Sequence, residues 1–183
     1  VYRSKLAATI VKGARFPLAT EGSRVLYLGA ATGTTASHVS DIIGHRGAIY
    51  CVEFASRAMR ELVNNVCSYR PNMVPIMEDA RLPERYQLMV SAVDSVYCDV
   101  AQPEQAKILA DNADAYLGAG GRAMLAVKAR SIDAVRTLDE IYRLETEKLR
   151  ARGFVIDQVV NLAPYDRAHI MVIATKQIGR PAR

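Results

Sequence analysis

Short apolar runs alternate with amphipathic stretches along most of the chain. Runs rich in Val, Ile and Tyr, too short for buried helices, predict strands at residues 24–29, 48–53, 73–77, 92–98, 121–127, 154–161 and 169–175. Between the first five of them, helix-like stretches cover residues 34–43, 56–67, 83–90 and 103–116. Strand and helix in strict alternation are typical of parallel βαβ units with right-handed crossovers. The pattern predicts an α/β fold with an open, doubly wound sheet.

The two ends of the chain depart from this alternation. Residues 3–14 carry Leu6, Ile10 and Val11 at helical spacing, which predicts an extra helix packed across the sheet. Near the other end, residues 134–151 read as a long charged amphipathic helix. The last two apolar runs follow it and are joined by the turn APYDRA. We expect them to form an antiparallel hairpin that completes a mostly parallel, seven-stranded sheet.

Length and composition favour one soluble, intracellular domain. A chain of 183 residues with 50% hydrophobic content can bury one core, so we expect a single domain over residues 1–183. No apolar run is long enough for a membrane span, and no secretory signal is apparent at the start. Cys51, Cys67 and Cys98 lack CxxC spacing and lie in or near apolar stretches. We expect buried thiols rather than metal ligands.

Charge is unevenly distributed along the chain. Residues 1–24 hold five Lys and Arg against one acidic residue, and residues 122–183 hold twelve against seven. The segment between them has more acidic than basic side chains. If the fold brings the basic ends to one face, an anionic polymer could bind there. A solvated basic surface is the equally good alternative.

The residues that follow each strand carry the candidate chemistry, because ligands of open α/β sheets bind outside the carboxyl ends of the strands. After the first strand comes a turn of small residues, namely Gly29, Ala30, Ala31, Thr32, Gly33, Thr34 and Thr35. Such a turn lets a ligand approach the backbone before a helix begins, although an ordinary tight βα turn would look the same. Thr34 occupies the place of the third glycine in the dinucleotide fingerprint, which argues against NAD.

Acidic residues follow the next three strands. They are Glu53 after the second strand and the acidic members of two runs, Glu78-Asp79-Ala80 after the third strand and Asp99-Val100-Ala101-Gln102 after the fourth. Glu53 comes 20 residues after Gly33, where a carboxylate can accept both hydroxyls of an adenosine ribose in NAD and S-adenosylmethionine sites alike. A ring of carboxylates would repel a pyrophosphate but suit a ligand with a sulfonium, an ammonium and an adenine amino group. Any one of them alone could be a helix cap or loop carboxylate.

Two basic residues lie near the same predicted edge. Lys128 follows the fifth strand, and we leave open a structural salt bridge with Asp99 and a catalytic role. His169 begins the last strand after a polar turn, where a structural histidine is the more common interpretation.

Several motifs together resemble the fibrillarin family of RNA 2′-O-methyltransferases, which work in box C/D guide ribonucleoproteins. They are RSKLAA, VLYLGAATGTTASHVSDIIG, VEF, EDAR, DVAQPEQA, KARSID and PYDRAHIMV, which occur in the family's order and spacing over nearly the whole chain. KARSID looks more archaeal than eukaryotic. The family also has a small β-rich region ahead of RSKLAA, which we do not expect within residues 1–183. The resemblance implies a Rossmann-like methyltransferase sheet.

The resemblance further implies the site. It assigns S-adenosylmethionine contacts to Thr34, Thr35, Glu53, Phe54, Asp79, Ala80, Asp99 and Gln102, and the strand-edge analysis adds Gly29, Ala30, Gly33, Val100 and Ala101. It also implies a catalytic set of Lys5, Asp99, Lys128 and His169, of which Lys5 would otherwise read as a surface charge.

The resemblance implies partners as well. It suggests a box C/D guide RNA, target rRNA or tRNA, a Nop56/58-type scaffold protein and, through that scaffold, a kink-turn-binding ribosomal-type protein, with no membrane partner. It places an archaeal protein in the cytoplasm and a eukaryotic one in the nucleolus.

Methyl transfer to a ribose hydroxyl is an in-line displacement that depends on alignment and on removal of the hydroxyl proton. We hypothesise that Lys128 removes this proton, with Lys5 supplying positive charge or binding a phosphate. Asp99 would then orient Lys128, and His169 would hold the set together.

Three alternatives stay open: a methyltransferase for small molecules or proteins, an NAD-dependent oxidoreductase, and a non-catalytic RNA-binding module. For the last, no RNP1-like run, GXXG clamp or zinc knuckle occurs.

Overall fold

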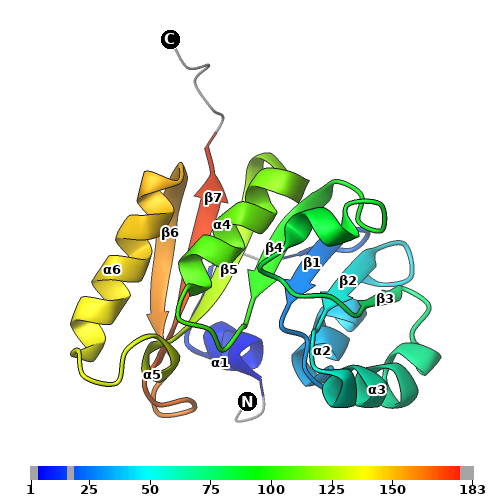
Figure 1. Ribbon diagram of the computed structural model, residues 1–183, viewed down its shortest axis with the longest axis horizontal. Coiled ribbons are helices and arrows are strands. Elements are labelled where there is room, and N and C mark those ends of the chain that lie inside the picture. Colours follow the sequence, from blue (N-terminus) through cyan, green and yellow to red (C-terminus); the bar gives the residue numbers. More distant parts are fainter. Residues whose placement is uncertain (1–3, 16–18, 178–183) are drawn as a thin grey trace.

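The computed structural model describes residues 4–15 and 19–177 and contains a seven-stranded sheet with helices on both faces (Figure 1). The strands are β1 (Arg24–Leu28), β2 (Ala48–Val52), β3 (Met73–Ile76), β4 (Val93–Cys98), β5 (Leu117–Lys128), β6 (Phe154–Asn161) and β7 (His169–Lys176). Their order in the sheet is β3-β2-β1-β4-β5-β7-β6. β1 to β5 pair in parallel, whereas β7 runs antiparallel to both β5 and β6. The predicted doubly wound sheet and its closing hairpin are confirmed.

The helices cover the two faces of the sheet in two groups. They are α1 (Lys5–Val11), α2 (Thr34–Ile43), α3 (Ser56–Asn65), α4 (Gln105–Tyr116), α5 (Ala129–Ile132) and α6 (Leu138–Ala151), with 3₁₀ turns η1 (Cys67–Tyr69) and η2 (Pro83–Tyr86). α4 and α6 pack on one face against residues such as Leu26 and Val96, and α1 to α3 pack on the other against residues such as Val25 and Tyr27. Successive strand residues point to opposite faces, so burial on both sides explains the nearly continuous apolar runs.

Two predicted elements in the middle of the chain differ from the structure. The stretch 83–90 forms only the η2 turn, because only Tyr86, which stacks on Tyr116, and Val90 are buried there, while Leu88 is 96% exposed. β5 begins four residues earlier than predicted, so Gly118, Gly120 and Gly121 lie in the strand. Gly120 has φ +78°, and the pairing with β4 shifts between Val93 and Ser95. Glycine tolerates this backbone, which lets an irregular strand follow the helix directly.

α1 lies at the carboxyl ends of the central strands (Figure 1). It begins at Lys5 because the Ser4 hydroxyl accepts a hydrogen bond from Ala7 N at 3.2 Å. Its buried residues are Leu6, Ala8 and Thr9. The predicted packing of Ile10 and Val11 is wrong, since both side chains are 56% exposed. Arg3, the first residue of the predicted helix, lies outside the described residues.

The C-terminal helix also begins later than predicted. A capping box between Thr137 and Glu140 starts α6, and the preceding residues form the short α5 and a turn around Asp133. Across residues 4–15 and 19–177, no helix is long and apolar enough to cross a membrane. Burial of the thiols is confirmed for Cys51 and Cys98, whereas Cys67 is half-buried.

Candidate active site

A cavity of about 260 Å³ opens at the carboxyl ends of the parallel strands. Its walls come from the segments that follow β1 to β5 and from α4, and its lining residues are Gly29, Ala31, Val52, Glu53, Phe54, Glu78, Asp79, Ala80, Arg81, Asp99, Val100, Ala101, Gln102, Ile108 and Lys128. Most of the predicted cofactor residues are thus brought together. Ala30, Gly33, Thr34 and Thr35 are not among the lining residues.

Glu53 is 8% exposed and holds two loops of the cavity wall. Its Oε2 accepts a hydrogen bond from Ala31 N at 2.9 Å, and its Oε1 accepts one from Ala55 N at 2.8 Å. Each carboxylate oxygen keeps a further lone pair. The side chain therefore both fixes the loop after β1 and can still accept hydrogen bonds from a ligand.

The glycines of the first loop are required by close packing. Gly29 has φ +78°, and a Cβ added there would lie 3.0 Å from the main-chain oxygen of Asp99. Gly33 has φ +92°, and a Cβ there would lie 2.5 Å from Leu62 Cδ1. Gly29 thus lets the loop after β1 pack against the main chain of Asp99, while Gly33 lets α2 begin against α3.

Thr35 connects the first loop to α1. Its hydroxyl donates to Ser4 Oγ at 3.2 Å, and both side chains are buried. Thr34 is the exposed first residue of α2, and Ala30 is buried with its N–H bonded to Val52 O. Of the predicted loop residues outside the cavity wall, Ala30 therefore supports the wall and Thr35 holds the helix that carries Lys5.

Asp79 is paired with a basic side chain at the cavity wall. Arg81 donates from Nε at 2.9 Å and from Nη2 at 2.6 Å to Asp79 Oδ2, which fixes the carboxylate in a forked contact. This hydrogen bonding lowers the pKa of Asp79 below its usual range, and the charge of Arg85 acts in the same direction. Asp79 is therefore ionised at neutral pH, and its exposed salt bridge contributes little to stability.

Asp99 lies between two ammonium groups. Lys128 Nζ is 2.9 Å and Lys5 Nζ 3.2 Å from Asp99 Oδ1, and all three side chains are less than 20% exposed. Lys128 Nζ also donates to the main-chain oxygen of Asp99 at 2.5 Å. Asp99 Oδ1 accepts no well-directed hydrogen bond, so the contacts act mainly through charge. The predicted Lys5, Asp99 and Lys128 meet in one cluster, with Lys128 at the cavity wall.

Gln105, which lies in the motif DVAQPEQA but was assigned no role from the sequence, holds the main chain of Lys128. The side chain is fully buried, with Oε1 accepting from Lys128 N at 2.9 Å and Nε2 donating to Lys128 O at 3.2 Å. Gln105 is the first residue of α4 and Lys128 is the last residue of β5, so the two elements meet at this pair. The pairing fixes where the Lys128 side chain leaves the sheet.

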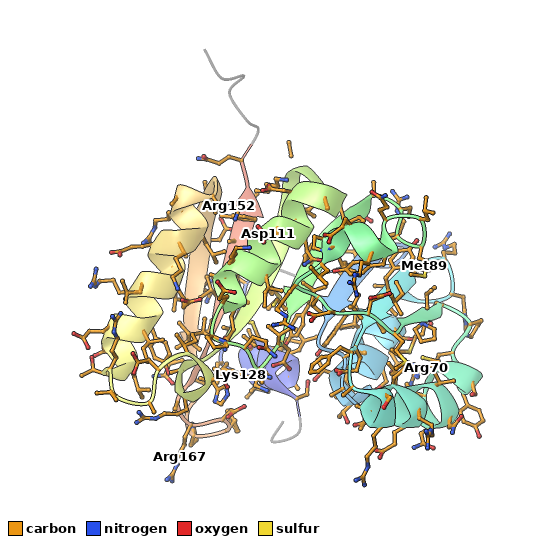
Figure 2. The ribbon with its side chains drawn as sticks, viewed as in Figure 1. Arg70, Met89, Asp111, Lys128, Arg152 and Arg167 are labelled. Carbon is orange, nitrogen blue, oxygen red and sulfur yellow. The ribbon has the colours of Figure 1, made fainter. Side chains whose placement is uncertain are left out.

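His169 is the register partner of Lys128 across β5 and β7. Its Nδ1 lies 2.8 Å from Asp166 Oδ1 and 2.7 Å from Arg167 O. The other oxygen of Asp166 lies 3.8 Å from Lys5 Nζ. The predicted histidine therefore joins the cluster through Asp166, a residue that sequence analysis did not single out. Figure 2 shows Lys128 and Arg167 at the same end of the molecule.

Comparisons with known proteins identify the family. The family model described as Fibrillarin matches residues 1–178. A fibrillarin-like rRNA/tRNA 2′-O-methyltransferase of Pyrobaculum islandicum is 55% identical over 96% of this chain and 75% of its own length. A protein of the same description from Methanopyrus kandleri is 53% identical over 94% of this chain and 74% of its own length.

Solved structures give the same result. Aeropyrum pernix fibrillarin, in complex with natively bound S-adenosyl-L-methionine, has a TM-score of 0.88 and 52% identity over 95% of this chain and 75% of that chain. A fibrillarin/Nop5p complex has a TM-score of 0.90 and 40% identity over 96% of this chain and 82% of that chain. A Thermotoga maritima S-adenosylmethionine-dependent O-methyltransferase, 16% identical with a TM-score of 0.73 over 97% of this chain and 67% of that chain, shows the fold alone. The resemblance seen in the motifs is confirmed, and the chain belongs to the fibrillarin family.

Proposed function

We propose that this member of the fibrillarin family, an S-adenosylmethionine-dependent RNA methyltransferase, methylates the ribose 2′-hydroxyl of rRNA and tRNA at sites that a box C/D guide RNA selects. The observation that carries the proposal is the cluster of Lys5, Asp99 and Lys128 beside a cavity lined with carboxylates. Cavity and cluster share Asp99 and Lys128, so a bound cofactor and a substrate hydroxyl would meet there.

The donor set fits S-adenosylmethionine. Glu53, Asp79 and Asp99 bring negative charge to the cavity, while Val52 and Ile108 give it apolar walls. Carboxylates of this kind suit the ammonium, the sulfonium and the ribose hydroxyls of the cofactor. When bound, the cofactor supplies an electrophilic methyl group.

The chain's own residues supply the rest of the chemistry. Lys128 is held by Asp99 and Gln105, so its amine can accept the hydroxyl proton from one fixed position once it has itself lost a proton. Lys5 brings a second positive charge to Asp99, where it can stabilise the developing alkoxide or bind the neighbouring phosphate. His169, opposite Lys128, closes the cluster on the hairpin side.

The two basic ends of the chain meet at this edge. Lys12 of the α1 end donates to Ala163 O in the β6–β7 turn at 3.0 Å, and Lys5 approaches Asp166 of that turn. Lys5, Lys12 and Arg167 therefore come from opposite ends of the sequence and can contact the phosphates of one RNA. Such contacts position RNA without reading bases.

Site selection is accordingly assigned to partners. The fibrillarin/Nop5p complex, with 40% identity to this chain, supports a Nop56/58-type scaffold. We assign the guide RNA and a kink-turn-binding ribosomal-type protein to the same assembly because specificity needs base pairing that this surface does not supply. The reported relatives are archaeal, which favours the cytoplasm as the place of action.

The test maps ribose methylation on one target RNA with tritiated S-adenosylmethionine, with and without scaffold and guide. We expect slow, unselective methylation by the chain alone and rapid modification of one nucleotide in the assembly, since positioning converts a bimolecular encounter into an effectively intramolecular one. Efficient modification of one defined site by the chain alone would overturn guide dependence. Label on bases or protein rather than ribose would overturn the proposed reaction.

A further inference from the structure

The turn between β6 and β7 presents a carboxylate to two members of the proposed catalytic set. Asp166 Oδ1 lies 2.8 Å from His169 Nδ1, and Asp166 Oδ2 lies 3.8 Å from Lys5 Nζ. The Asp166 side chain is 32% exposed, so it lies at the rim of the cluster. It joins α1 to β7 at the point where the two ends of the chain meet.

The turn is well fixed by its own hydrogen bonds. The N–H groups of Tyr165 and Asp166 both donate to Leu162 O, at 2.9 and 3.1 Å, and Leu162 N donates to His169 O at 3.1 Å. Lys12 Nζ donates to Ala163 O from the α1 side. These contacts determine the backbone of Asp166 without its side chain, so the carboxylate is not needed to form the turn.

The surroundings of His169 determine where its proton lies. Nδ1 faces two acceptors, a carboxylate oxygen of Asp166 and the main-chain oxygen of Arg167. Nδ1 must therefore carry a hydrogen, which leaves Nε2 as the lone-pair nitrogen of the neutral ring. The Nδ1 hydrogen bond is directed to the main-chain oxygen of Arg167, and Asp166 Oδ1 lies 2.8 Å away as a charge contact, so turning the ring would lose both.

We propose that Asp166 is a positioning residue for the methyl transfer, acting through His169 and Lys5; this inference rests on the proposed function. Its carboxylate fixes the ring of His169 with Nε2 free to accept a hydrogen bond from the substrate ribose, and it draws Lys5 toward the hairpin. Through Lys5 the contact continues to Asp99 and Lys128, so one chain of charges connects all four members of the set.

The test measures single-turnover methylation of a guide-paired target RNA by the assembled complex at saturating S-adenosylmethionine. Asp166→Ala should lower the rate about tenfold to hundredfold, the range expected for a residue that orients a reacting group. Cofactor affinity from calorimetry should stay within about twofold, and Asp166→Glu should restore most of the rate. Asp157→Ala is the matched control, since Asp157 is an exposed carboxylate of the same hairpin that accepts a hydrogen bond from Thr175 Oγ1 at 2.7 Å.

A double-mutant cycle separates positioning from a purely structural effect. If Asp166 acts through His169, Asp166→Ala should cost much less in a His169→Gln background than in the wild type. Equal costs in both backgrounds, or a wild-type rate for Asp166→Ala, would overturn the proposal. Wild-type protein that fails to methylate ribose would instead contradict the proposed function.

A measurement that does not depend on catalysis distinguishes failure of the Asp166 proposal from failure of the proposed function. In protein labelled with ¹⁵N-histidine, Nδ1 of His169 should show the shift of a protonated ring nitrogen and Nε2 that of a lone-pair nitrogen at a pH where the ring is neutral. The reversed pattern would overturn the assignment of the ring whether or not the protein methylates RNA.

Discussion

The side-chain amide of Gln105 binds the main chain of Lys128 at both of its polar groups, accepting from N at 2.9 Å and donating to O at 3.2 Å. Lys128 is the last residue of β5, where ladder hydrogen bonds end and the chain turns into α5. Without Gln105, the buried N–H and C=O groups at this point would lose these partners. The amide of Gln105 thus supplies Lys128 with the main-chain hydrogen bonds that a neighbouring strand supplies to earlier residues of β5.

Gln105→Met keeps the shape of the side chain but removes both hydrogen bonds. Each unsatisfied buried group costs about 1–3 kcal/mol, so with two groups we expect a loss of about 2–6 kcal/mol in the free energy of unfolding. The single-turnover rate should also fall, because Lys128 is no longer held. Urea unfolding and methyl-transfer assays check both effects. The control is Gln87→Met at an exposed position, and equal stability of the two variants would contradict the assigned role of Gln105.

Glu53→Ala should weaken the binding of S-adenosylmethionine. The variant removes a ligand acceptor and frees the loops at Ala31 and Ala55, whose N–H groups it holds. A buried acceptor of this kind is worth about 1–3 kcal/mol, or about five- to 150-fold in affinity. Calorimetry measures the change against Glu147→Ala, an exposed carboxylate of α6. Wild-type affinity in Glu53→Ala would place the cofactor elsewhere.

Lys128→Ala should separate binding from chemistry. Asp99 keeps Lys5 as a partner, so the cavity should still bind S-adenosylmethionine within about threefold of the wild type. Loss of a proton acceptor should lower the single-turnover rate by about 10²–10⁴. Lys107→Ala removes an exposed ammonium from α4 and serves as the control. A rate within a factor of three of the wild type, where chemistry is limiting, would assign the base to another residue.

How well each feature of the molecule could be predicted depends on how far apart in the sequence the interacting residues lie. Apolar runs such as those of β1 and β4 are local and mark strands directly, and strand ends then place Glu53 and Asp99 at one edge. Local pattern failed at residues 83–90, where helical spacing did not reveal that Leu88 stays exposed. Lys5 came only from the family resemblance, because its partner Asp99 is 94 residues away.

Gln105 and Asp166 mark the limit of this approach. Gln105 reads as an ordinary first-turn residue of a helix until α4 is seen beside the end of β5. Asp166 reads as a polar turn residue until the turn is seen beside α1. Both roles depend on how elements meet in space, which no local pattern encodes.

The cysteines should differ sharply in reactivity. Burial raises the pKa of the Cys98 thiol to about 12 and that of the Cys51 thiol further. It raises the pKa of the half-buried Cys67 thiol less. Because the thiolate is the reactive form, Cys67 should be labelled first by a disulfide reagent. Raising the pH from about 7 to about 9 should speed labelling of Cys67 in the folded protein and leave the other two nearly unreactive. Mass spectrometry identifies the site, and unfolded protein should label all three.

Arg167 offers a test of how the chain binds RNA. It is exposed beside His169 and extends from the molecule at the end where Lys128 lies (Figure 2). A side chain in this place can contact a phosphate next to the target ribose, so Arg167→Ala should weaken RNA binding by a similar factor for unrelated sequences. Titrations between about 50 and 200 mM salt should give a slope of log affinity against log salt that is smaller by about one. Arg143→Ala removes an exposed guanidinium that is already paired with Glu147 on α6, and it should leave the slope unchanged. An unchanged slope in Arg167→Ala, or a loss confined to one RNA sequence, would show that Arg167 does not serve as a phosphate contact.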